Sequence, residues 1–507
     1  MSYCANWDRS LLGVVGVWSR REACAISVVV ATAIIIRTLP EILSFPYLIG
    51  YDTLYYAGEI QRAQSCLDLI STLPSPFLPL ALCPFGKVVG ALTLFKIYPP
   101  LAYGAFAGAL FLFARKSLGL DRFQSILSSL FVVLQFGMLR VSWDLHSNLL
   151  GMAFLLLLLV ALSGPTTSRR LLAIASLTLL VVLAHALTAL LMVGIFLIMG
   201  AASYLRRDFA RLWNVLVGIL VSAPILCWMA FINPALVSQL FTKYTWPDTM
   251  QTVPLFFVLL CLPMLPLIFL GRRPSRFEAA WMAFAGTLAF SSILLPVAFS
   301  FWDRWMFMML PVLGLLAASG MLRVADVGTR FIHGLGRVRR RSYVWDKIIR
   351  AVLIVLIFAP SVYIALGFMT YPSDHPFWYL DNSLLWKGSG SGVPASMLEN
   401  TIALQDIPDL MRVISQLNQI VEGKDVVLAA DVFYGWLRLY LNEGKSMIWF
   451  RNYDPVQSVI ALAKQRGFRT IYMVWFVPGA SWHLPGPDLS SFRVVVQSGI
   501  IAAYQYA

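Results

Sequence analysis

Long apolar runs recur along this chain and constrain its fold more than any other feature. A run of about 17–25 apolar residues is long enough to cross the hydrocarbon core of a bilayer as a helix. Only 13% of the 507 residues are charged, whereas soluble domains carry about a quarter. The sequence therefore predicts a polytopic α-helical membrane protein. The expected spans are residues 23–43, 97–114, 123–141, 148–163, 171–186, 187–204, 213–231, 253–270, 277–298, 305–323 and 350–370.

Basic residues cluster in alternate loops between these expected spans, about eleven in number. The clusters lie at residues 19–22, 114–122, 166–170, 204–212, 271–278 and 323–350. Loops rich in Lys and Arg remain on the cytoplasmic side of a membrane. The alternation predicts a cell-membrane protein with a cytoplasmic N-terminus and an extracytoplasmic C-terminus. Because these loops account for the basic balance, the net charge of +14 indicates no nucleic-acid partner.

Three segments are open to a second interpretation. Residues 74–95 are apolar enough to span, but a span there would reverse every later loop against its charge, so we expect an interfacial or re-entrant segment. The run 171–204 forms either one span or two spans split at His185, and the split preserves the alternation. Basic residues 19–22 precede a run too long for a signal peptide, so we expect a retained first span.

The six cysteines show no CxxC motif and no Cys/His spacing typical of a metal site. Cys66 and Cys83 fall in the expected outer loop, near residues 44–96. They can form a disulfide if that loop is extracytoplasmic, and two unpaired thiols are the alternative.

The composition changes after the expected membrane domain, residues 1–370. Residues 371–397 are rich in Pro, Gly and Ser and predict a linker. Residues 398–507 alternate helix-like and strand-like segments, which predicts a small, mostly parallel α/β domain outside the membrane, with Asp454 as a helix N-cap. Because this domain has no GxGxxG motif and no P-loop, we do not expect it to bind nucleotides.

Isolated ionisable residues collect in the loops on the expected outer side, including a short loop at residues 142–147. Placing an ionisable side chain at membrane depth is energetically unfavourable, so such residues mark candidate functional sites. They are Arg37, Glu41, Asp52, Glu59, Lys96, Arg140, Asp144, His146, His185, Lys243, Asp248, Asp303 and Arg304.

Several of these residues also have a purely structural interpretation. Asp52 can be a helix N-cap, and Glu59 with Arg62 can be exposed on the helix that follows. His185 can cap a helix, and Asp303 can pair locally with its neighbour Arg304. The nearby tryptophans fit an aromatic belt at the membrane interface. These are Trp143, Trp302 and Trp305.

Four short motifs carry a family resemblance. They are GYDTLYY at 50–56, RVSWDLHSN at 140–148, LAHALTALL at 183–191 and FWDRWMFMMLPVLGLLAA at 301–318. With the external C-terminal domain, they resemble the GT-C superfamily of integral-membrane glycosyltransferases, which use lipid-linked sugars. The similarity is to archaeal members related to oligosaccharyltransferase catalytic subunits and protein mannosyltransferases. The chain lacks the WWDxG motif of oligosaccharyltransferases, which argues against asparagine as the acceptor.

The resemblance implies an inverting transfer from a polyprenyl-phosphate-linked sugar to a protein, glycan or lipid acceptor. Asp52 becomes the first-loop catalytic carboxylate, and Asp144 with His146 supplies the second acidic site. Asp52 and Asp144 are the expected ligands if a divalent cation such as Mg or Mn takes part. Many members of the superfamily have paired acids where this chain has Asp52-Thr53, so the sequence leaves the metal requirement open. The available cations for the leaving phosphate are Arg304, Arg140 and Lys96, with Glu59, His185 and Asp303 as accessory residues.

Two other functions fit the same membrane topology. A non-catalytic scaffold subunit of a membrane complex would keep the architecture with degenerate motifs. A transporter would show polar residues near mid-span and an inverted repeat, which this sequence does not clearly have.

The predicted topology can be tested by cysteine labelling of the C-terminal domain. Cysteines introduced between residues 406 and 451 should react with impermeant thiol reagents in right-side-out membranes, because an odd number of spans precedes them. A cysteine in the basic loop 204–212 should react only after lysis. The reverse pattern would exclude the topology.

Overall fold

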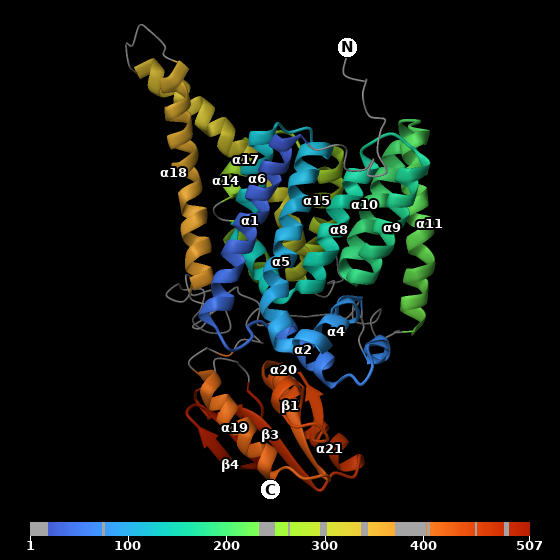
Figure 1. The fold of residues 1–507 in the computed structure, drawn as a ribbon, viewed down its shortest axis with the longest axis vertical. Coiled ribbons are helices and arrows are strands. Elements are labelled where there is room, and N and C mark those ends of the chain that lie inside the picture. The colour runs from blue at the N-terminus through green and yellow to red at the C-terminus, as the bar shows by residue number, and fades with distance from the viewer. Residues whose placement is uncertain are drawn as a thin grey trace. The chain divides into compact units, whose positions relative to one another are not determined.

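A computed structural model describes residues 19–72, 77–232, 249–261, 264–294, 302–335, 343–370, 402, 406–451, 454–480 and 486–507. The chain forms two compact units (Figure 1). The first, here called the helical unit, comprises residues 1–37 and 99–367. The second, the α/β unit, comprises residues 38–98 and 368–507, so the expected outer loop and the C-terminal domain belong to one unit.

The membrane helices follow the expected apolar runs. Their bounds are α1 Arg20–Leu43, α5 Ala91–Leu112, α6 Arg122–Val133, α7 Phe136–Asp144, α8 His146–Leu162, α9 Ser168–Ala184, α10 Ala186–Leu205, α11 Phe209–Ile232, α13 Thr249–Cys261, α14 Leu265–Leu270, α15 Arg276–Ala289, α16 Ser291–Leu294, α17 Trp302–Leu335 and α18 Tyr343–Thr370. A π-helical turn, η2 (Phe113–Ser117), continues α5. Every expected span therefore overlaps a described helix.

Five of the described helical segments are long and apolar enough to cross a membrane. They are Arg20–Leu43, Ala91–Ser117, Ala186–Leu205, Phe209–Cys227 and Trp302–Ile332. Helices α6 and α7 make a sixth candidate, bent by 63° at their junction. A multi-pass arrangement follows from these helices, and the count of eleven spans stays a prediction.

Side-chain contacts show which ends of α1, α5 and α8 lie together. At the basic end, Arg115 pairs with Glu22 at 3.4 Å, and the hydroxyls of Ser117 and Ser163 lie 3.2 Å apart. At the other end, Arg37 Nε donates to the carbonyl of Ser142 at 3.2 Å. The basic loops of these helices therefore share one end, as the charge pattern predicts. The side of the membrane that this end faces stays a prediction.

Small residues let α1 and α5 pack closely. A Cβ at Gly104 would lie 2.7 Å from Ile34 Cγ1, and one at Gly108 would lie 3.3 Å from Val30 Cγ2. Helices approach in this way inside a membrane when small residues line the contact, because lipid supplies no hydrophobic driving force.

The two ambiguous apolar segments are both broken by a residue outside helical geometry. His185 is extended (φ −163°, ψ 125°) between α9 and α10, so the expected split is confirmed. Residues 77–89 form a separate short helix, α4 (Phe77–Val89), and Gly90 at φ +86° separates it from α5. A φ in this range favours glycine. Phe85 and Val88 of α4 are exposed.

The expectation of an interfacial aromatic belt is wrong for three tryptophans. Trp143, Trp302 and Trp305 expose only 3%, 6% and 1% of their surface. Trp302 packs edge-on against Phe256, and Trp305 packs edge-on against Phe284. The indoles of Trp302 and Trp305 fill the contacts of α17 with α13 and α15, so they serve as core residues.

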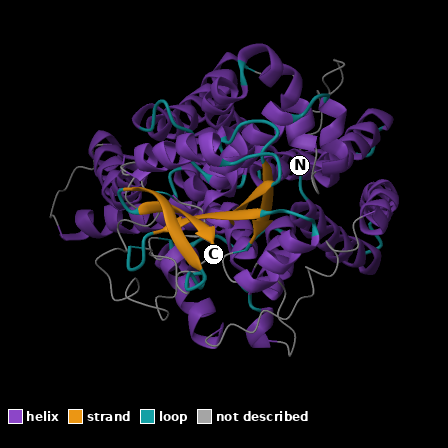
Figure 2. Ribbon diagram, turned by 90° about the horizontal axis from the view of Figure 1, so that it is seen from below, coloured by secondary structure: helices purple, strands orange, loops and turns teal. Residues whose placement is uncertain are grey.

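The α/β unit contains a five-stranded sheet (Figure 2). Its elements are α2 Tyr51–Arg62, η1 Cys66–Asp68, α3 Leu69–Thr72, α4, α19 Ile407–Ile420, β1 Asp425–Ala430, α20 Asp431–Tyr440, β2 Ser446–Phe450, α21 Val456–Gln465, β3 Thr470–Phe476, β4 Phe492–Ser498 and β5 Ile501–Tyr506. The strand order is β2-β1-β3-β5-β4. Strand β1, which lies between β2 and β3, is buried along its whole length.

The sheet is mixed, which corrects the expectation of a mostly parallel one. Strand β1 is parallel to β2 and β3, whereas β5 is antiparallel to both β3 and β4. The short turn at Gly499, φ +52°, makes β4 and β5 antiparallel. A connection this short joins only antiparallel strands, because a parallel crossover needs about a dozen residues.

The expected N-cap at Asp454 is also wrong. Helix α21 begins at Val456 with Pro455 as its N-cap residue. The carboxylate of Asp454 instead accepts a hydrogen bond from the Arg451 amide at 2.8 Å, within the preceding turn.

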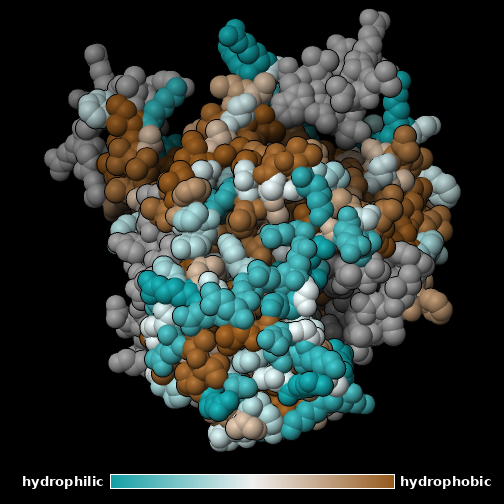
Figure 3. Space-filling view, turned by 60° about the horizontal axis from the view of Figure 1, so that its bottom comes forward, coloured by the Kyte–Doolittle hydropathy of each residue, from teal (hydrophilic) through white to brown (hydrophobic). Residues whose placement is uncertain are grey.

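In the face shown in Figure 3, hydrophobic surface predominates over the membrane helices and hydrophilic surface over the α/β unit.

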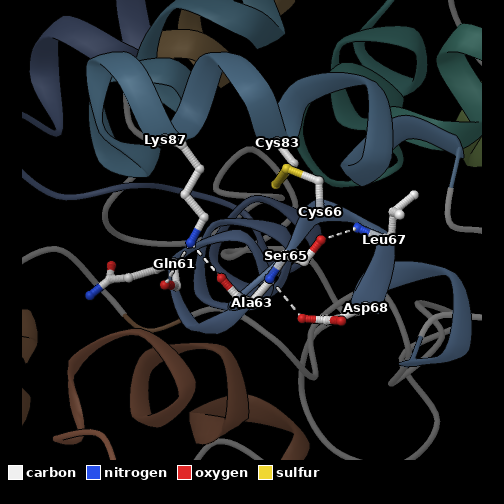
Figure 4. The surroundings of a disulfide bond; sticks show 8 residues. All are labelled: Gln61, Ala63, Ser65, Cys66, Leu67, Asp68, Cys83 and Lys87. Atoms are coloured by element: carbon white, nitrogen blue, oxygen red, sulfur yellow. Dashed lines mark hydrogen bonds between the residues drawn. A yellow bond between two sulfur atoms is a disulfide. The ribbon is translucent and has the colours of Figure 1, made fainter.

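A disulfide joins Cys66 to Cys83, with a Cα–Cα distance of 5.7 Å, and confirms the pairing that the sequence left open. Figure 4 shows its surroundings. Lys87 Nζ donates to the carbonyl of Ala63 at 2.5 Å, just past the end of α2. The bridge and this lysine fasten α4 to the end of α2.

Removing the disulfide should destabilise this loop. The bridge closes a loop with a sequence separation of 17, for which chain entropy gives about 3 kcal/mol. The paired change Cys66→Ala/Cys83→Ala should lower the thermal unfolding midpoint in detergent, and a reductant should then have no further effect. Cys24→Ala, which removes an exposed free thiol, is the control. An unchanged midpoint in the paired variant would contradict the stabilising role.

Candidate functional site

Asp52 lies in the first turn of α2 and is not its cap. The helix begins at Tyr51 after Gly50, which has φ +86° and supplies no side-chain cap. The interpretation of Asp52 as an N-cap is therefore wrong. Its half-buried carboxylate lies at the positive end of the helix dipole, which favours the ionised form.

Glu59 is buried in a salt bridge, which corrects the expectation that it is exposed. Only 5% of its surface is accessible. Arg438 of α20 donates to its carboxylate through Nε at 2.8 Å and Nη2 at 3.1 Å. Burial opposes the charge of Arg438, but the hydrogen bond and the negative charge of Glu59 outweigh it and raise the Arg438 pKa. This two-pronged geometry is the strong form of a carboxylate–guanidinium contact.

Arg62 holds the end of α20 through its backbone. It donates to the carbonyls of Arg438 at 2.6 Å, Leu441 at 2.7 Å and Leu437 at 3.3 Å. The last carbonyls of a helix have no partner within the helix and carry partial negative charge. Arg62 donates hydrogen bonds to these carbonyls and places a positive charge beside their partial negative charge. Burial, followed by the charge of Arg438, lowers the Arg62 pKa.

Two glycines let α2 and α20 lie side by side (Figure 1). A Cβ at Gly58 would lie 2.9 Å from Arg438 Cγ, and one at Gly435 would lie 2.8 Å from Leu54 Cβ. Without side chains at these positions, the helices approach closely enough for Glu59 and Arg62 to reach α20. We call this contact the α2–α20 junction; it comprises Gly58, Glu59, Arg62, Gly435 and Arg438.

Two tyrosines extend the junction toward Asp52. The rings of Tyr55 and Tyr434 lie 5.8 Å apart. Burial raises the pKa of Tyr55, followed by the charges of Glu59, Tyr434 and Asp52. Burial and Glu59 also raise the pKa of Tyr434. Both phenols therefore remain protonated at neutral pH, and Tyr55 lies within reach of the Asp52 charge.

In the helical unit, polar side chains gather where helices break. His185 caps α10, since its Nδ1 accepts from the Thr188 amide at 3.4 Å and lies 3.2 Å from Thr188 Oγ1. Thr188 Oγ1 donates to Asn148 Oδ1 at 3.1 Å and lies 4.0 Å from Met308 Sδ. Helices α8, α10 and α17 thus meet at one polar cluster, and the cap interpretation of His185 is confirmed.

The remaining candidates of the helical unit lie on the adjoining helix ends. His146 is fully buried at the start of α8, and the charge of Arg37 acts on its ring. Arg140 is buried on α7. The charge of Arg304, half-buried in the first turn of α17 beside the buried Asp303, acts on His185. The Asp144 side chain, Lys243 and Asp248 lie outside the described residues.

Lys96 already has an ionic partner in the α/β unit. Its Nζ lies 3.1 Å from Glu41 Oε2 and 2.6 Å from Ser44 Oγ. A phosphate would therefore have to compete with a carboxylate that is 4% exposed. Lys96 fastens the start of α5 to the end of α1.

Within the described part of the chain, no three His, Cys, Asp or Glu side chains are grouped as a metal site. Asp52 belongs to the α/β unit, and the Asp144 side chain is outside the described residues. A cation held by these two residues stays a prediction.

Sequence reasoning missed Arg438 and the role of Arg62. Arg438 is 379 residues from Glu59 along the chain, and no local pattern marks the pair. The signal that was available is a glycine in the middle of each helix, Gly58 and Gly435. A glycine there lowers helix stability by about 1 kcal/mol and indicates a close packing contact.

No protein-family model and no curated protein matches the chain. Among solved structures, it is similar to the arabinofuranosyltransferase AftD from Mycobacteria, determined by single-particle cryo-EM. The TM-score is 0.49 and the sequence identity 13% over 97% of this chain. The chain spans 40% of the length of AftD.

A double-mutant cycle should show strong coupling between Glu59 and Arg438. Glu59→Gln or Arg438→Gln alone leaves a buried charge unpaired, which costs about 3–5 kcal/mol. The double variant should be destabilised by less than the sum. Thermal unfolding of the full chain in detergent provides the measurement. As a control, Arg412→Gln removes an exposed partner of Asp409 and should change stability by less than about 1 kcal/mol. Additive effects would show that the pair is not coupled.

Proposed function

We propose that this chain is an integral-membrane glycosyltransferase of the GT-C type. It would transfer a sugar, with inversion, from a polyprenyl-phosphate-linked donor to an acceptor hydroxyl on the extracytoplasmic face of the cell membrane. The proposal rests chiefly on α2, a loop helix that carries Asp52 in its first turn and is fixed to the α/β domain at its other end. Such an arrangement holds one carboxylate in a defined position within the α/β unit.

Asp52 is the proposed general base. In an inverting transfer, its carboxylate takes the acceptor hydroxyl proton as that oxygen attacks the anomeric carbon, and the lipid phosphate leaves with the bonding electrons. The helix dipole keeps the carboxylate ionised but makes it a weaker base. Tyr55, protonated, half-buried and within reach of the Asp52 charge, can orient the acceptor by hydrogen bonding.

The polar cluster of the helical unit is the proposed phosphate site. Arg304 lies beside it, and a guanidinium can donate two hydrogen bonds to one phosphate. Within the described ranges, Asn148 Nδ2 of this cluster is a buried donor without a hydrogen-bond partner. Buried donors normally have partners, and phosphate oxygens would supply them. Arg140 is a second candidate, and Lys96 is a weaker one because Glu41 neutralises it.

His146 and Asp144 are proposed to complete the site near the end of α7. Carboxylate oxygens are the ligands that hard divalent cations prefer, so Asp52 and Asp144 are the residues that would hold Mg or Mn. When bound, the cation would neutralise charge on the leaving phosphate.

The disulfide gives support for the proposed orientation that does not depend on loop charges. Disulfides persist in oxidising compartments outside the cytoplasm. The bridge between Cys66 and Cys83 therefore favours an extracytoplasmic position for the loop that carries Asp52. The basic loops, which share the other end of their helices, agree with this side.

Asp52→Asn should abolish transfer while the protein stays folded. The change removes the base with almost no change in size, so transfer of labelled sugar from a polyprenyl-phosphate donor should fall about 10²–10⁴-fold. Donor binding and the thermal midpoint should match wild type. Asp68→Asn is the control and should retain transfer, because this acid of the same loop accepts a hydrogen bond from the Ser65 amide at the start of η1.

Three results would count against this proposal. Transfer by Asp52→Asn at a near wild-type rate would exclude Asp52 as the base. Absence of transfer by the wild type with intact donor binding would favour a scaffold subunit. Donor-independent solute flux in vesicles would favour a transporter.

A further inference from the structure

A row of aromatic rings leads from the α2–α20 junction to the edge of the sheet. Tyr55 of α2 lies 5.8 Å from Tyr434 of α20, and Tyr434 lies 6.3 Å from Trp449 of β2, measured between ring centroids. We call these three residues the aromatic row. All of them belong to the α/β unit.

Trp449 is the exposed end of the row. Its neighbours in β2, Ile448 and Phe450, expose 6% and 2% of their surface, whereas Trp449 exposes 46%. Side chains alternate between the two faces of a strand, so the core receives Ile448 and Phe450, and Trp449 lies on the opposite face. The core therefore does not require an indole at this position.

Trp449 is nevertheless held in a fixed orientation. Its Nε1 donates to Asp431 Oδ1 at 2.6 Å, and Asp431 is 8% exposed at the start of α20. The guanidinium of Arg451 lies 5.9 Å from the Trp449 ring centroid. A charge-assisted hydrogen bond to a buried carboxylate restricts rotation of the ring. The result is an oriented aromatic face flanked by one carboxylate and one guanidinium.

This combination matches the chemistry of a carbohydrate. A sugar ring has a face of C–H bonds, which packs on an aromatic ring, and an edge of hydroxyl groups, which both donate and accept hydrogen bonds. Asp431 offers an acceptor, while Arg451 and the tyrosine hydroxyls offer donors. An acyl chain would leave these charged groups without polar partners, which is unfavourable.

The row also begins near the proposed reaction centre. Tyr55 lies three residues after Asp52 on α2 and within reach of its charge. Residues three apart on a helix share one face. A chain that occupies the row would therefore extend from the proposed base toward the edge strand of the sheet.

We propose that the aromatic row binds the acceptor as a neutral carbohydrate chain. The acceptor class is then a glycan, in preference to a protein side chain or a lipid. This inference rests on the proposed function for the direction of transfer, but the binding itself requires neither donor nor catalysis.

Direct binding tests the site. The full chain in nanodiscs is titrated, without donor, with fluorescently tagged neutral hexasaccharides of the mannan, glucan, galactan and arabinan types. Wild type should bind at least one of them, and Trp449→Ala should raise its Kd about tenfold, as expected for removal of an aromatic anchor. Trp449→Phe should restore most of the affinity, because it keeps an aromatic face. Trp345→Ala, which removes a 61% exposed indole from the helical unit, should bind as wild type does.

Two results would overturn this inference: binding of none of the four glycans by wild type, or an unchanged Kd in Trp449→Ala with an unchanged thermal midpoint. The outcome is separable from that of the transfer assay. Binding that depends on Trp449, with no transfer under any condition, would remove the proposed function and retain the glycan site. Transfer to a non-carbohydrate acceptor, without glycan binding, would retain the proposed function and remove the glycan site.

Discussion

The buried ion pair between Glu59 and Arg438 is the interaction on which the α/β unit depends. A carboxylate that is 5% exposed is stable only when a cation and hydrogen bonds compensate its lost hydration. Arg438 supplies both, and it comes from a helix 379 residues away in sequence. The first loop and the C-terminal domain are thereby parts of one compact body.

Three fastenings hold the loop between α1 and α5, and each acts by a different physical means. At its base, Lys96 forms an ion pair with Glu41. In its middle, the disulfide of Cys66 and Cys83 joins α4 to the end of α2. At its far side, the α2–α20 junction joins it to the α/β domain. Together, these three contacts fix the position of α2 and of the candidate base in its first turn. General-base catalysis requires such a defined position.

The helical unit accommodates polar groups among apolar helices. Its polar side chains gather where the backbone leaves helical geometry, because the unsatisfied amides at a helix start need acceptors. His185 supplies one such acceptor to Thr188, and Thr188 reaches Asn148 on the neighbouring helix. The Asn148 amide nitrogen remains without a hydrogen-bond partner there, which is why we propose this cluster as the phosphate site.

The sequence by itself determined the local elements of this protein. Apolar runs marked the membrane helices, loop charge marked their alternation, and the extended residue at His185 was found from the requirement that this alternation continue. The order of helices and strands beyond residue 406 also followed from periodicity. These features depend on residues that are close together along the chain. The spacing of such residues directly indicates which of them share one face of a helix or strand.

Only the tertiary structure decided which elements meet. Glu59 looked like an exposed helix residue, and Trp302 and Trp305 looked interfacial, because a short window does not reveal what packs against it. Asp52 was identified as a candidate, but the contact of its neighbour Tyr55 with Tyr434 was not. The antiparallel turn of β4 and β5 was missed for the same reason. Local periodicity specifies an element and its apolar face, whereas burial and ion pairing depend on contacts between segments hundreds of residues apart.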